Sequence, residues 1–204
     1  APGAGRRPSE RRRGVPHRRR PAHDVRCPVH VTLRATPGLP SLRAERVFPA
    51  LRGALARSSG AAFRVLQFSV QRDHVHLLVE SDGSLSRGVQ GLAIRLAKAV
   101  NRTLARHGRV WSDRYHSRRL ATPREVRNAL VYVLHNVRKH VPHFRGVDSR
   151  SSAAWFSGWK KTRETARAPS PVARARTWLA AIGWRRHGLI GEDERPQRSR
   201  GRRS

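Results

Sequence analysis

The sequence predicts an α+β fold, an antiparallel sheet with helices on one face. Two kinds of local pattern and their order predict it. Short runs that alternate apolar and polar residues are typical of strands, and segments with apolar residues every three or four positions are typical of helices. They follow one another as strand, helix, strand, strand, helix, strand, helix. That order fits a split βαβ plan, in which the sheet is antiparallel and the helices pack against it.

The first half of this plan consists of a strand, a helix and a hairpin. Residues 28–35 alternate in polarity, which indicates a strand. An amphipathic helix is predicted over 41–58, with a glycine following its end. Residues 63–71 and 74–80 are rich in β-branched and aromatic residues and are separated by two residues. We expect them to pair as an antiparallel hairpin.

The second half contains the clearest helix, over 85–104, where leucine and valine recur at spacings of four or three. Residues 111–120 are predicted to be a loop that enters a short strand. Thr122 and Glu125 form a capping box around a proline, so a third helix begins there and runs to about His140.

Composition divides the chain into four parts. Residues 1–26 contain Arg, Pro and Gly with almost no apolar side chains, so a disordered basic arm is expected. Residues 27–142 hold all the predicted strands and helices of the domain. Residues 143–190 are predicted to be a C-terminal extension that docks on the domain through its apolar end, and 191–204 a loose basic tail.

The charge of the chain points to a polyanionic partner. It has 44 Lys and Arg against 13 Asp and Glu, a net charge of +31. The two ends contribute +7 and +3 of this, so the central part still carries +21. Nucleic acid is the commonest partner of such a surface.

Several classes of protein are excluded by composition. A single cysteine rules out a disulfide framework and a cysteine-based zinc finger. No apolar run approaches the length of a membrane span, and the N-terminal sequence has no apolar signal region, so no membrane partner and a cytoplasmic location are expected. Thirteen acidic residues, no three of them suitably placed, argue against a nuclease that uses three carboxylates.

A pair of histidines, His74 and His76, lies in the second strand of the predicted hairpin. Residues two apart on a strand share one face, and the apolar residues between and after them face the other way. The histidines are therefore expected on the face that the helices leave open, where one metal ion can bind both imidazoles. On softness grounds such ligands favour zinc or manganese. The alternative is a pair of solvent-facing histidines without a role.

Tyr132 lies opposite the apolar stripe of the third helix, and Asn136 follows one turn later. A hydroxyl nucleophile beside an amide oxygen that can complete a metal site is a functional arrangement, and the alternative is a surface tyrosine. Tyr115, the other tyrosine and therefore the rival nucleophile, is predicted to lie on a strand, where it is expected to be packed. The remaining histidines of this region are expected to be solvated: His116, His135, His140 and His143.

A basic cluster precedes the third helix. Arg114, Arg118 and Arg119 follow Trp111 closely in the sequence. Arginines beside an aromatic ring are suited to DNA phosphates and an unpaired base, so these four residues are candidate DNA contacts. The alternative is a solvated basic edge.

Taken together, the sequence HVHLLV at 74–79 and the sequence YVLHN at 132–136 resemble the REP-associated tyrosine transposases. These belong to the single-tyrosine HUH superfamily, named for two histidines around one bulky apolar residue. The resemblance covers roughly residues 28–141 and extends to the segment DRYHSR at 113–118 and to WLAAIGWRRHGLI at 178–190.

The resemblance implies a ferredoxin-like HUH nuclease fold and an enzyme that nicks and rejoins single-stranded DNA at or near REP-like hairpins. His74 and His76 match its metal ligands, Tyr132 its nucleophile and Asn136 its third ligand. It further implies magnesium or manganese, a 5′-phosphotyrosine intermediate with a free 3′-hydroxyl, a monomer or homodimer, and action at the nucleoid of a bacterial cell.

Two positions depart from the family pattern. Asp73 stands where an asparagine often precedes the first histidine, and Val137 stands where a proline often follows the third ligand. Neither removes a group that the chemistry needs. The alternative function is a catalytically inactive protein that binds DNA hairpins, which requires the same charge. The presence of both histidines, the tyrosine and the asparagine together favours the enzyme.

Overall fold

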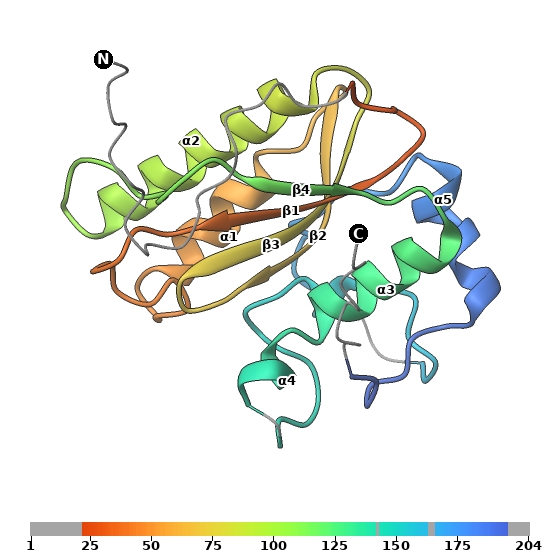
Figure 1. Ribbon diagram of the computed structural model, residues 1–204. Helices are drawn as coiled ribbons and strands as arrows, with labels where there is room; N and C mark the ends of the chain where they lie inside the picture. The colour runs from red at the N-terminus through yellow and green to blue at the C-terminus, as the bar shows by residue number, and fades with distance from the viewer. Residues whose placement is uncertain (1–21, 142, 163–165, 196–204) are drawn as a thin grey trace, which may run out of the picture.

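Four strands form one antiparallel sheet in the computed structural model, which describes residues 22–141, 143–162 and 166–195 (Figure 1). They lie side by side in the order β2-β3-β1-β4. Their bounds are Val29–Arg34 for β1, Phe63–Val70 for β2, His74–Ser81 for β3 and His116–Arg119 for β4. The α+β class, the hairpin and the split βαβ order predicted from the sequence are confirmed.

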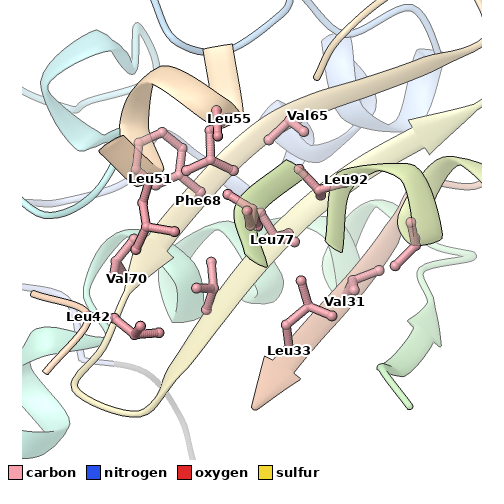
Figure 2. Close-up of a cluster of buried hydrophobic side chains, with 14 of the residues drawn as sticks. Val31, Leu33, Leu42, Leu51, Leu55, Val65, Phe68, Val70, Leu77 and Leu92 are labelled. Carbon is pink, nitrogen blue, oxygen red and sulfur yellow. The ribbon is translucent and has the colours of Figure 1, made fainter. Parts of the chain in front are cut away.

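Two helices cover the first face of the sheet, α1 (Phe48–Ala56) and α2 (Leu85–Thr103). They bury the alternate residues of β3, namely Val75, Leu77 and Val79, each of which is fully enclosed. Figure 2 shows the leucines and valines of the helices and strands meeting in this core. The apolar periodicity that predicted the strands and α2 is the pattern that this packing requires.

A third helix, α3 (Pro123–Leu134), lies over the second face together with the C-terminal extension (Figure 1). Leu66 and Leu78 project from β2 and β3 on this side and pack against the apolar stripe of α3. The prediction of helices on one face therefore holds for α1 and α2 but is wrong for α3. Leu66 follows Val65 of the first face, and an irregularity in the β2–β3 register between Val65 and Gln67 returns Phe68 to the first face after it.

Helix α1 begins at Phe48, seven residues after the predicted start. Pro49 stands in its first turn, where the missing N–H costs nothing. A helix from Ser41 would place that proline in its interior, where it removes a hydrogen bond and clashes with a carbonyl. Residues 41–47 form turns instead.

The capping box predicted for α3 is present. The Glu125 backbone N–H donates to the Thr122 hydroxyl at 3.2 Å, and the Glu125 carboxylate accepts from the Ala121 backbone N–H at 2.8 Å. The helix ends earlier than predicted, at Leu134, and a separate turn, α4 (Val137–His140), follows. His135 interrupts the helix, with φ of −107° and ψ of 16°. Its buried ring packs against the extension rather than continuing the helical face.

The C-terminal extension docks on the second face through η1 (Ala153–Trp155), α5 (Trp178–Ala181) and η2 (Gly183–His187). Its firmest polar attachment is the buried Glu80 carboxylate of β3. This accepts from the backbone N–H groups of Arg176 and Thr177 at 2.9 and 3.0 Å, and from the Arg64 guanidinium at 3.2 Å. A buried carboxylate with this many donors fixes the position of the segment.

Residues 191–195, the first part of the predicted loose tail, are attached to the domain through Glu194. Glu194 accepts from the Arg127 guanidinium at 2.7 Å and from the Gly191 backbone N–H at 2.8 Å. Residues 196–204 and most of the predicted arm, 1–21, lie outside the described residues. No helix in the described part of the chain is long and apolar enough to cross a membrane.

Candidate active site

Strand β3 directs His74 and His76 to the second face of the sheet, toward α3. Their ring centroids are 4.6 Å apart, and His76 is only 5% exposed. The sequence correctly places them on one face opposite Val75, but that face is covered rather than open. The cover excludes most solvent from the imidazoles.

The Nδ1 atom of each imidazole already has a partner. Nδ1 of His74 lies 2.7 Å from a carboxylate oxygen of Asp73, which in turn accepts from Arg34 at 2.9 Å. Nδ1 of His76 lies 3.1 Å from the Thr32 hydroxyl and 3.3 Å from Nε2 of His30. A histidine that binds metal through one ring nitrogen holds its other nitrogen in this way.

The other ring nitrogen of His76 is unusual. Nε2 is buried and has no hydrogen-bond partner among the described residues. Such an atom costs free energy unless a ligand satisfies it. A buried Nε2 without a protein partner, beside a second histidine, is the arrangement expected of an imidazole that binds a metal ion.

Burial keeps these imidazoles neutral. It lowers the pKa of His76 to about 2 and that of His30 to about 4, with nearby positive charges acting in the same direction. Burial also lowers the pKa of His74, although Asp73 opposes that shift. Neutral imidazole is the form that donates a lone pair to a metal.

Helix α3 places Tyr132 against the histidines. Its ring centroid is 5.0 Å from that of His76 and 5.4 Å from that of His30. The Lys139 ammonium lies over the same ring, 4.0 Å from its centroid. The tyrosine is half-buried, so its ring is held by three neighbours and still reaches solvent.

Asn136 lies at the break between α3 and α4 and is 1% exposed. Neither its amide oxygen nor its amide nitrogen has a hydrogen-bond partner among the described residues. Within that part of the chain, no group of three or more His, Cys, Asp or Glu side chains is placed to hold a metal ion. A metal bound by the two histidines therefore needs another oxygen ligand, and an unpartnered amide oxygen is of the right kind.

The profile of a protein family described as "Transposase IS200 like" matches residues 50–136. Residues 50–136 are therefore similar to the IS200-like transposases. The matched region contains His74, His76 and Tyr132 and ends on Asn136. A solved structure described as a REP-associated tyrosine transposase bound to a REP hairpin is 16% identical, with a TM-score of 0.49 over 60% of this chain and 73% of that chain. No curated protein matches the chain.

The second tyrosine of the matched region lies on the other side of the sheet. Tyr115 packs beside the core of the first face, and its hydroxyl lies 3.1 Å from that of Ser86 at the start of α2. It is therefore separated from His74 and His76 by the sheet itself. The geometry brings only Tyr132 to the histidine pair.

The four histidines expected to be solvated differ in exposure. His135 is buried rather than solvated, since Nε2 lies 3.1 Å from the Gly191 carbonyl oxygen and the ring packs against Trp159. His140 is exposed as expected, but its ring centroid lies 6.2 Å from that of His74, at the rim of the site. His116 and His143 are exposed.

The predicted DNA contacts do not form one cluster. Arg118 pairs across strands with His30 and shares the face of Tyr132, whereas Arg119 pairs with Val29 and shares the opposite face. Arg114 is exposed and lines a cavity with Arg119.

Trp111 is partly buried, and its role in stacking on a base stays a prediction. Its indole N–H donates to the Ala93 carbonyl at 2.9 Å, and its ring packs against the core. Three residues of the site were not anticipated from the sequence: His30, Thr32 and Lys139. The alternation of β1 places the first two beside β3, a signal that is readable only once the strand pairing is known.

Proposed function

We propose that the chain is a metal-dependent endonuclease and strand transferase for single-stranded DNA. It cleaves at or near DNA hairpins through a covalent 5′-phosphotyrosine on Tyr132. The observation that carries the proposal is the orphaned Nε2 of His76 beside the tyrosine ring, in a domain of transposase type. A surface tyrosine and a solvated histidine pair would show neither feature.

The metal ligands in this proposal are His74, His76 and Asn136. The imidazoles are neutral, and both His76 and Asn136 bury side-chain atoms that lack partners, so the donor set fits a divalent cation. The resemblance to HUH enzymes favours magnesium or manganese. When bound, such an ion offsets negative charge on the non-bridging oxygens of the scissile phosphate.

The reaction exchanges one phosphoester bond for another. The Tyr132 hydroxyl oxygen attacks phosphorus, a bond forms between them, and the bond from phosphorus to the 3′-oxygen breaks. The phenol proton leaves to solvent, and the departing 3′-oxygen gains one. A 3′-hydroxyl that later attacks the phosphotyrosine restores the phenol and joins two strands, so no external energy source is needed.

Neighbouring side chains orient the nucleophile. His30 and His76 pack against the edges of the Tyr132 ring and limit its rotation. Lys139 places a positive charge over the ring, close to where a DNA phosphate must lie. Arg118 approaches from β4 on the same face, next to His30. Fixing the hydroxyl near the phosphate removes an entropic part of the barrier.

The substrate proposed is a DNA hairpin, of the REP-like kind that the resemblance implies, with an unpaired strand at the cleavage point. The large positive charge of the chain supports a polyanion, and the resemblance supports the hairpin. A cytoplasmic protein that acts at the bacterial nucleoid, as a monomer or homodimer, stays a prediction.

A denaturing gel with an end-labelled hairpin oligonucleotide and manganese tests the proposal. The wild type should form an adduct that migrates with protein. Tyr132→Phe keeps the ring and removes only the nucleophilic oxygen, so it should bind the hairpin and form no adduct. Tyr115→Phe is the matched control and should retain most of the activity.

Two outcomes would contradict the proposal. An adduct that persists in Tyr132→Phe and disappears in Tyr115→Phe would reassign the nucleophile. A wild type that binds hairpins tightly but forms no adduct with any divalent metal would favour the alternative, an inactive hairpin-binding protein.

A further inference from the structure

An apolar cavity with a cationic rim lies at the end of β4, apart from the proposed active site. Its volume is about 790 Å³. We propose that it binds an unpaired base of the DNA strand, with Trp178 as the stacking surface. This inference rests on the proposed function, because the strand that it holds is the one that Tyr132 cleaves.

The wall of the cavity is apolar and open to solvent. Trp178 is 47% exposed and Val25 is 48% exposed, and both line it together with Leu179. The other four tryptophans, all among the described residues, are buried or partly buried, so Trp178 is the one whose indole is open to a ligand.

The Trp178 ring is held in place before any ligand binds. The Arg186 guanidinium carbon lies 4.8 Å from its centroid. Gly183 lies against the ring so closely that an added Cβ would come within 2.7 Å of it. A ring fixed in this way loses little conformational entropy when a base stacks on it.

Three arginines form the rim of the cavity: Arg26, Arg119 and Arg176. Their side chains are 86%, 60% and 63% exposed, so each can reach a phosphate. Two carboxylates nearby pair with these arginines, Asp24 with Arg26 at 3.2 Å and with Arg119 at 3.8 Å, and Asp82 with Arg176 at 3.6 Å. Three arginines against two carboxylates leave the rim with a net positive charge, and Asp82 also pairs with the buried Arg64.

The charge and polarity of the cavity favour a nucleotide as its ligand. An apolar wall with a positive rim matches a nucleotide, which offers a flat base and an anionic phosphate. The arginine-rich residues 1–21 are a poor occupant, because like charges would face one another. An uncharged apolar peptide would leave the arginines unused.

The edge of the sheet connects this cavity with the tyrosine. Strand β4 is an outermost strand, and its consecutive residues Arg118 and Arg119 point to opposite faces. Arg118 lies beside His30 on the face of Tyr132, and Arg119 lines the cavity. A DNA strand that crosses this edge meets one arginine on each side and carries its next unpaired base to Trp178.

Equilibrium binding without chemistry tests the inference. Tyr132→Phe and Tyr132→Phe/Trp178→Ala are titrated in chelator against two labelled hairpins, one with a single-stranded flank and one without. Loss of the indole should weaken binding of the flanked hairpin about tenfold and leave the unflanked hairpin unchanged. Ile182→Ala, a truncation at a 61% exposed residue of the same segment, is the matched control and should change neither.

An abasic scan of the flank identifies the stacked nucleotide. Removing one base should weaken binding to the Trp178 protein about tenfold, whereas the Trp178→Ala protein should be indifferent to removal at that same position. Arg176→Gln provides a second variant that keeps the indole. It should lower the slope of log affinity against log salt by about 0.7 for the flanked hairpin.

The inference would be overturned if Trp178→Ala bound both hairpins with the affinity of the parent. It would also be overturned if the substitution weakened binding of both hairpins equally and no abasic position removed the difference in affinity between parent and variant. A salt slope unchanged in Arg176→Gln would equally remove the rim from the DNA path. None of these binding measurements involves adduct formation. A negative result for Trp178 therefore does not affect the test of Tyr132, and a negative result for Tyr132 does not affect the test of Trp178.

Discussion

The two faces of the sheet are built from the same strands and differ in almost every physical respect. On the first face, Val75, Leu77 and Val79 meet α1 and α2 in a core that is apolar throughout. On the second, β3 presents His76 and Glu80, and His76 retains a buried nitrogen without a partner. Among the residues that the structure describes, no buried side-chain atom without a partner belongs to the core of the first face.

The contrast shows that β3 serves stability and chemistry with alternate residues. Those on one face build the core, and those on the other face build the candidate site. A buried polar atom without a partner destabilises a protein, and a domain tolerates a few of them only when other packing is good. The first face supplies that packing. The second face keeps polar atoms unsatisfied in the position where a ligand can satisfy them. Substitutions on the two faces should therefore have separable effects.

The largest effect is expected from the histidines. Replacing both His74 and His76 with alanine should reduce adduct formation about a thousandfold or more, since the metal loses its ligands. Thermal stability should hardly fall, and hairpin affinity should stay near that of the wild type, because arginines dominate it. Gel assays, calorimetry and anisotropy measure the three quantities. A double variant that still nicks DNA would show that the metal, if any, binds elsewhere.

The next effect concerns two adjacent leucines on opposite faces. Leu77→Ala and Leu78→Ala should each lower the free energy of unfolding by about 2–5 kcal/mol, measured by urea titration. At temperatures where both variants are folded, Leu77→Ala should keep its rate of adduct formation. Leu78→Ala should slow it, because Leu78 packs in the cluster that includes α3, the helix that carries Tyr132. Equal rates in the two variants would break the comparison between the faces.

The smallest effect separates the two roles of Asn136. Asn136→Leu removes a buried amide without partners, so the metal-free protein should gain about 1–3 kcal/mol in unfolding free energy. Manganese at one hundred times its dissociation constant should stabilise the wild type by about 2.7 kcal/mol. The variant should gain much less. Thermal melts with and without manganese measure both, and an equal gain in the two proteins would remove Asn136 from the ligand set.

Much of the fold was predictable because polarity alternates clearly in the strands and recurs regularly in α2 and α3. The position of α3 was not predictable. An apolar stripe shows that one side of a helix is buried, but it does not show which face of the sheet buries it. The apolar residues that α3 covers include Leu66 and Leu78, and their contact with the helix joins segments that are far apart in the sequence. The late start of α1 was readable, because Pro49 is visible in the sequence.

The central residues of the candidate site were predictable from the sequence, but the residues packed around them were not. Two histidines and a tyrosine could be singled out from spacing alone. The sequence did not distinguish Trp111, which is partly buried, from Trp178, which is exposed, because burial depends on contacts far away in the sequence. Thr32 and His30 needed the pairing of β1 with β3 before they could be assigned a place.

The tight connection between β2 and β3 has a consequence for how such a domain can diverge. Gln71 and His74 close the hairpin with a backbone hydrogen bond of 2.8 Å, which leaves Arg72 and Asp73 as the turn. One inserted residue after the turn would exchange the two faces of β3, moving imidazoles into the core and valines toward the tyrosine. Related sequences can therefore differ by many substitutions along the hairpin. A change in the length of the hairpin would disrupt folding and activity together.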